Sequence, residues 1–96
     1  MSTFIARVQL TVNTSKNYTI LRDAIIKAGF TKNIKGQHGA IYILPNGNYL
    51  IESGKTIDEI LTTVKAVINK IGDKGAQVLI TEVKKGGNVW LNLPLA

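Results

Sequence analysis

The chain has 96 residues, of which 45% are hydrophobic and 19% are charged, and it contains no cysteine. The length and these proportions are typical of a single globular domain spanning residues 1–96. The absence of cysteine excludes disulfides, thiolate metal sites and a cysteine nucleophile. Twelve Lys and Arg against six Asp and Glu give a formal net charge of +6. Such an excess either favours an anionic partner or simply keeps a small protein soluble.

No apolar run approaches the ~18 residues of a membrane span. The first residues lack the basic segment and apolar core that are typical of a secretory signal. We therefore expect a cytoplasmic protein that makes no contact with a membrane.

The first element that we expect is a strand at residues 4–12, with the sequence FIARVQLTV. Apolar residues alternate with others along it, which is the period of a strand with one buried face. The buried side would comprise Phe4, Ala6, Val8, Leu10 and Val12, and the other side Ile5, Arg7, Gln9 and Thr11.

A helix is expected at residues 16–28. Asn13, Thr14 and Ser15 can cap its first turn, and Gly29 suits the left-handed position that follows a helix. Its apolar stripe consists of Tyr18, Leu21, Ala24, Ile25 and Ala28. The polar residues 31–39 then predict a long connection or an irregular start of a strand.

Residues 40–53, AIYILPNGNYLIES, predict a β-hairpin. A three-residue turn at Pro45-Asn46-Gly47 would place Ile41, Ile43, Tyr49 and Ile51 on one face. A two-residue turn at Asn46-Gly47 would mix the faces. We favour the three-residue turn because it collects the isoleucines on one side.

Thr56 and Glu59 form a capping box that predicts the start of a second helix, and Gly72 predicts its end. Its apolar stripe consists of Ile57, Ile60, Leu61, Val64, Ile68 and Ile71. Residues 76–83 and 89–93 are expected to be strands joined by a turn. Pro94 would end the second of them, because proline cannot donate a hydrogen bond to a neighbouring strand.

This order of elements predicts an α+β fold of the ferredoxin-like βαββαβ type, with a short extra C-terminal strand. Each helix has a single apolar stripe, so we expect both helices on one face of a mostly antiparallel sheet. The opposite face would carry Ile5, Arg7, Gln9, Thr11, Tyr42, Leu44, Leu50 and Trp90. Such a face needs a partner or a cover, and pairing of the last strand with a second copy would give a homodimer.

The residues that could carry chemistry do not form a recognisable catalytic set. The six acids are explained mostly by capping and by solvated faces, so we predict no metal and no cofactor. His38 is the single histidine. It is a catalytic candidate only if the protein is an enzyme, and otherwise an exposed loop residue. Candidate contacts to a nucleic acid or a protein partner are Arg7, Lys32, Lys35, Tyr42, Lys84, Lys85 and Trp90.

The runs FIARVQLTVNTSKNYTILRDAIIKAGF, IYILPNGNY, GKTIDEILTTVKAVINKIG and VLITEV…VWLNL together resemble a small uncharacterised bacterial and prophage family. That family is similar in fold to the GhoS antitoxin and to the CRISPR adaptation nuclease-like proteins. The resemblance implies an RNA-directed or toxin-neutralising role as one candidate function. The nuclease-like proteins carry an aspartate at the end of their first strand, where this chain has Thr11-Val12-Asn13. The resemblance therefore implies no catalytic residue.

These patterns leave three functional hypotheses. The first is a non-enzymatic binding or regulatory module that uses the open sheet face and its edge to contact a protein or a nucleic acid. The second is a small ribonuclease or antitoxin of the GhoS kind, which would use His38 and other polar residues. The third is a structural homodimer.

Overall fold

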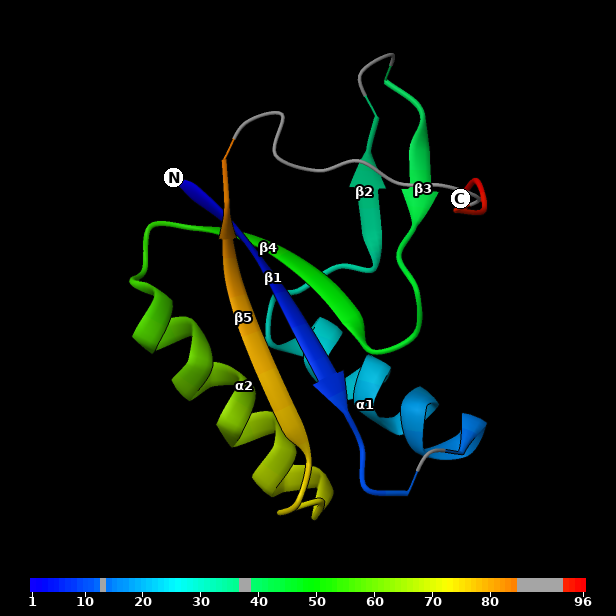
Figure 1. The fold of residues 1–96 in the computed structure, drawn as a ribbon, viewed down its shortest axis with the longest axis vertical. Helices are drawn as coiled ribbons and strands as arrows, with labels where there is room; N and C mark the ends of the chain where they lie inside the picture. Colours follow the sequence, from blue (N-terminus) through cyan, green and yellow to red (C-terminus); the bar gives the residue numbers. More distant parts are fainter. Residues whose placement is uncertain (13, 37–38, 85–92) are drawn as a thin grey trace.

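The computed structural model describes residues 1–12, 14–36, 39–84 and 93–96. Along the chain lie β1 (Ser2–Gln9), α1 (Ser15–Lys27), β2 (Asn33–Lys35), β3 (Ile41–Ile43), β4 (Asn48–Ser53), α2 (Ile57–Ile71) and β5 (Gln77–Val83) (Figure 1). The fold is therefore α+β, as the sequence pattern predicts.

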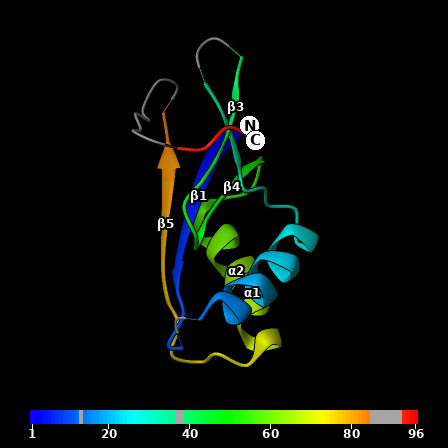
Figure 2. The same cartoon turned by 90° about the vertical axis from the view of Figure 1, so that its right-hand side faces the viewer.

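Three strands form an antiparallel sheet in the order β4-β1-β5, with the first strand of the chain in the centre. β2 and β3 form a second, two-stranded antiparallel sheet, and a bridge between Thr31 and Leu50 joins it to β4. Both helices cover the same side of the three-stranded sheet (Figure 2). The arrangement is compatible with the ferredoxin-like topology, so the predicted fold class is confirmed.

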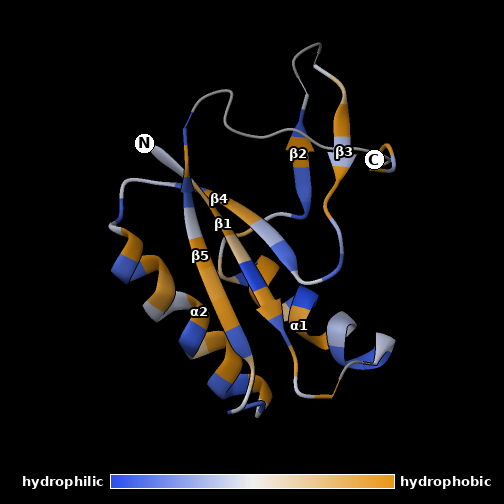
Figure 3. Cartoon of the chain, viewed as in Figure 1, coloured by the Kyte–Doolittle hydropathy of each residue, from blue (hydrophilic) through white to orange (hydrophobic). Residues whose placement is uncertain are grey.

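The core lies between the helices and the inward side of the three-stranded sheet. Alternate residues of β1 are buried there, because successive side chains of a strand point to opposite faces. Apolar segments recur between polar ones along α2 (Figure 3), as expected of a helix that buries one stripe. The largest fully buried side chains are Tyr49, Phe4, Leu21, Ile25, Ile60 and Val64. Burial of a side chain of this size contributes about 1.5–3 kcal/mol.

Local hydrogen bonds set the boundaries of the helices. At the start of α1, the Thr14 side chain accepts a hydrogen bond from the N–H of Asn17. At the start of α2, Thr56 Oγ1 accepts from the N–H of Glu59 at 3.2 Å, and Glu59 Oε1 accepts from the N–H of Thr56 at 2.9 Å. Gly72 ends α2 in the left-handed conformation, with a φ of 82°. The predicted caps of both helices are confirmed.

The hairpin predicted at residues 40–53 is wrong in its pairing. A turn does form there, since the N–H of Asn48 donates to the carbonyl of Pro45 at 3.0 Å. The strands on its two sides have different partners, however: β3 pairs with β2, and β4 pairs with β1. The turn is bound to the larger sheet, because the N–H of Val8 donates to the carbonyl of Gly47 at 2.7 Å. It therefore leads the chain from one sheet into the other.

Three apolar residues lie differently from their predicted places. Val12 is 56% exposed, because it follows the end of β1 and the alternation of the strand no longer applies to it. Leu44 is buried, although the pattern placed it on the outer face of the sheet. Ile57, in the first turn of α2, is 40% exposed.

The described end of the chain pairs with β3. The N–H of Ile43 donates to the carbonyl of Pro94 at 2.8 Å, and the N–H of Ala96 donates to the carbonyl of Ile41 at 3.0 Å. The predicted strand at residues 89–93 lies outside the described residues except for Leu93, which belongs to no strand.

Candidate binding face of the sheet

One side of the three-stranded sheet is covered by neither α1 nor α2 (Figure 2), and we call it the open face. Its side chains come from every second residue of each strand, opposite to the buried ones. The strand register assigns to it Thr3, Ile5, Arg7 and Gln9 from β1, Asn48, Leu50 and Glu52 from β4, and Gln77, Leu79, Thr81 and Val83 from β5. The predicted positions of Ile5, Arg7, Gln9 and Leu50 on this face are confirmed.

Arg7 lies on the central strand of the open face. Its cross-strand neighbours are Asn48 on β4 and Leu79 on β5. The Arg7 side chain is exposed, and no described residue forms a hydrogen bond or an ion pair with it. A guanidinium presents five N–H donors in a planar fork, which matches the geometry of a carboxylate or a phosphate. Arg7 is therefore available to bind an anionic group.

A hollow with a volume of about 380 Å³ adjoins Arg7, and we call it the Arg7 hollow. Its polar lining consists mostly of side-chain amides, from Gln9, Asn46, Asn48 and Gln77. None of the described lining residues is acidic, and among them Arg7 carries the single formal charge. Because an amide both donates and accepts hydrogen bonds, the hollow suits an anionic group that is flanked by peptide-like groups.

A second hollow continues along the open face from Arg7. It shares Arg7 and Asn48 with the first hollow and is further lined by Ile5, Thr81, Glu82, Val83 and Lys84. Apolar residues from β1 and β5 therefore lie next to the Arg7 hollow, whereas the register of β5 directs the Glu82 side chain to the helix side.

The loop at residues 45–48 is fixed in place beside the Arg7 hollow. Gly47 has a φ of 81°, and a Cβ atom added to it would overlap the backbone oxygen of Val8. The side-chain amide of Asn48 donates to the carbonyl of Asn46 at 3.2 Å. A glycine is therefore required at this position, and the two asparagines reach the hollow from a backbone that is bound to β1.

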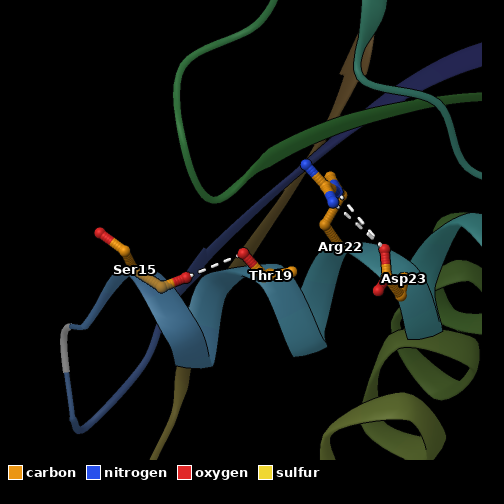
Figure 4. A network of polar contacts seen from close by, with 4 residues as sticks. All are labelled: Ser15, Thr19, Arg22 and Asp23. Carbon is orange, nitrogen blue, oxygen red and sulfur yellow. Dashed lines mark hydrogen bonds and ion pairs between the residues drawn. The ribbon is translucent and has the colours of Figure 1, made fainter.

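Three acidic side chains away from the open face form hydrogen bonds or an ion pair with residues near them. Asp23 lies 3.4 Å from Arg22 on α1 (Figure 4). Capping hydrogen bonds at the start of α2 hold the pKa of Glu59 below its usual value. Hydrogen bonds from Thr11 do the same for the pKa of Asp73. None of these three carboxylates forms an ion pair with Arg7.

Lys32 takes part in a separate group of contacts. Its Nζ donates to the carbonyl of Pro45 at 3.1 Å and lies 5.3 Å from the centroid of the Tyr49 ring. Burial, together with the nearby Arg22, lowers the pKa of Lys32. Burial also raises the pKa of Tyr49 to about 12. Lys32 therefore stabilises the loop at residues 45–48 rather than facing the open side of the sheet.

The structure brings together two of the predicted contact residues, Arg7 and Lys84, which line the same hollow. The other described candidates lie elsewhere. Lys32 binds the loop at residues 45–48, while Lys35 and Tyr42 belong to the β2–β3 hairpin. The predicted contact set is thus divided between two parts of the molecule.

His38, Lys85 and Trp90 lie outside the described residues, so the roles suggested for them stay predictions. Within the described ranges, no group of three or more His, Cys, Asp or Glu is placed to hold a metal ion. No helix in the same ranges is long and apolar enough to cross a membrane.

Sequence reasoning missed the contribution of β5 to the open face. Gln77, Leu79 and Thr81 occupy alternate positions of that strand, so the period used for residues 4–12 could have placed them on one side. Asn46 was predicted as a residue of the Pro45-Asn46-Gly47 turn, and Asn48 as a strand residue on the outer face of the hairpin. No local signal connects them to Arg7, because their neighbourhood depends on the pairing of β4 with β1.

The sequence matches no protein-family model, and comparison with curated proteins finds no match. The resemblance to the GhoS-like family therefore stays a prediction, and functional conclusions depend on the geometry of the described residues.

Proposed function

We propose that the chain is a non-enzymatic binding module whose open face binds an extended polypeptide segment with an acidic side chain among apolar ones. The observation that supports this function is the exposed Arg7, which no described residue pairs, beside a hollow without acidic lining. A carboxylate of the partner would accept two parallel hydrogen bonds from the guanidinium. Ile5 and Leu79 would contact the neighbouring apolar side chains of the segment.

The composition of the open face favours a polypeptide over a nucleic acid. The residues that the strand register assigns to it include no aromatic ring on which a base would stack. Tyr18, which lines the Arg7 hollow from α1, accepts a hydrogen bond from the N–H of Leu10 at 3.3 Å. A phosphate backbone that followed the face would also meet negative charge, because Glu52 belongs to the face. Its apolar residues, which suit a protein partner, are Ile5, Leu50, Leu79 and Val83.

The ribonuclease or antitoxin function has weaker support. Its candidate residue His38 lies outside the described residues, and no described geometry favours it over binding. Nucleic-acid binding is the alternative outcome of the experiment that tests the open face.

The test is a titration of isotope-labelled protein followed by NMR, with two separate probes. One probe is a short peptide of alternating glutamate and valine, and the other is single-stranded oligouridylate. We expect the peptide to shift the amide resonances of β1 and β5. We expect Arg7→Glu to weaken peptide binding by at least about tenfold, because it removes charge-assisted hydrogen bonds and reverses the charge.

Lys65→Glu is the matched control, because it changes the net charge equally at an exposed position of α2, in the other layer of the molecule. If both variants weaken peptide binding alike, general electrostatic attraction explains the binding and the proposal fails. If oligouridylate shifts the open face and the peptide does not, the face is a nucleic-acid site instead.

A further inference from the structure

β5 forms an edge of the three-stranded sheet, with β1 as its neighbour among the described strands. An edge strand exposes a row of unpaired backbone N–H and C=O groups, and natural edges are commonly protected by lysine, proline or a bulge. The sequence of β5, QVLITEV, has no lysine, arginine or proline, and its one charged residue is Glu82. Leu79 within it is 56% exposed. This edge is therefore well suited to pair with another strand.

The sequence of β5 is self-complementary for antiparallel pairing. A two-fold axis perpendicular to the sheet at Ile80, the central residue, would pair the strand along its full length. Glu82 would then lie opposite the partner's Val78, so that no like charges face each other. An axis one residue nearer the N-terminus would instead place Lys84 opposite the partner's Lys74. Pairing over the full length of β5, with no like charges opposed within it, therefore favours the axis at Ile80.

The same axis is favourable on the side of the helices. α2 lies alongside β5 (Figure 1), so the axis would set α2 antiparallel to its copy. The first turn of α2 carries Asp58 and Glu59, and its last turn carries Lys70. The acidic end of each helix would therefore lie toward the basic end of the other, and the helix dipoles would also be opposed favourably.

We propose that the occupant of the β5 edge is a second copy of this chain, paired antiparallel about Ile80. Two three-stranded sheets would join into one continuous sheet with β4 at both ends. The two open faces would become one surface with two Arg7 hollows. This inference concerns the edge of the sheet and holds whether or not the open face binds a peptide.

The test measures the mass of the full chain in solution by sedimentation over a range of concentrations, with the mass of two chains expected for the wild type. In the proposed register, Leu79 lies opposite the partner's Thr81. The double variant Leu79→Lys/Thr81→Lys therefore opposes like charges twice, and so does Leu79→Glu/Thr81→Glu. We expect each to weaken pairing by at least about a hundredfold. Both positions are exposed, and circular dichroism checks that the fold is retained.

Mixing the two double variants is the decisive step, because every introduced lysine then lies opposite a glutamate. We expect the mixture to form a one-to-one pair while each variant alone stays a monomer. A wild type that remains a monomer up to about 1 mM would overturn the proposal. Dimers that persist in both double variants would overturn it as well, and a mixture that fails to pair would refute the register. Arg7→Glu leaves the edge unchanged, so loss of peptide binding and loss of pairing are separate results.

Discussion

Gly47 connects the fold to the candidate site, and its replacement by alanine tests that connection. The residue has a φ of 81°, and its carbonyl accepts the hydrogen bond from Val8 at 2.7 Å. A Cβ atom at this position would overlap the Val8 backbone oxygen. Gly72 is the matched control, because it has a φ of 82° and a Cβ atom there would meet nothing within 4 Å.

The two substitutions share one cost and differ in another. The left-handed conformation costs a residue with a Cβ atom roughly 1–2 kcal/mol, and this applies to both. Gly47→Ala must in addition displace the loop from β1, since Val8 lies in a strand and is 4% exposed. Overpacking costs about 1–3 kcal/mol, and the lost hydrogen bond costs about 0.5–1.5 kcal/mol. We therefore expect Gly47→Ala to lower the free energy of unfolding by about 2–4 kcal/mol more than Gly72→Ala, out of a total near 5–15 kcal/mol.

Urea denaturation of both variants beside the wild type measures the difference. Because Asn46 and Asn48 line the Arg7 hollow from the same loop, Gly47→Ala should also weaken binding of the glutamate–valine peptide, whereas Gly72→Ala should not. Equal losses of unfolding free energy in the two variants would refute the docking of this loop on β1.

The remaining predictions concern the core and two titrating groups. Leu21→Ala should cost about 2–5 kcal/mol of unfolding free energy because Leu21 is fully buried, whereas Ile20→Ala, at a position 45% exposed, should change it by no more than about 0.5 kcal/mol; denaturation of both variants checks this. The hydrogen bonds from Thr11 lower the pKa of Asp73 in the folded state. The contribution of the Asp73 carboxylate to stability is therefore present above the ordinary pKa of 3.8 and is lost as the pH falls through the lower pKa of the folded state. Asp73→Asn should therefore flatten the acid side of a plot of melting temperature against pH. Burial raises the pKa of Tyr49 from 10.0 to about 12, so its contribution is complete below pH 10.0 and is lost as the pH rises toward about 12. Tyr49→Phe should remove an ionisation near that pH from the ultraviolet absorbance titration, and an unchanged titration would contradict the burial of this ring.

Features that depend on neighbours along the chain could be predicted from the sequence. α2 begins at the capping box of Thr56 and Glu59 and ends at the left-handed Gly72, as predicted. Both signals could be read from the sequence because each involves hydrogen bonds or a backbone conformation within a few residues. The alternation along β1 likewise predicted that Arg7 and Ile5 lie on the side opposite to the core. A period of two is a property of any extended chain with one buried face.

Features that depend on which strands pair were decided only by the tertiary structure. Residues 41–43 have the composition of a strand. Nothing in their local sequence shows that they pair with β2, or that β1 pairs with β4 instead. The environment of Arg7 likewise requires Asn48 and Leu79, which are distant in sequence, to lie on its two sides. Burial of the helix stripes against one common sheet selects that pairing. Amphipathic periods and caps can therefore be predicted from the sequence of each segment alone. The Arg7 hollow forms only in the folded protein, because burial of the shared core determines which strands are neighbours.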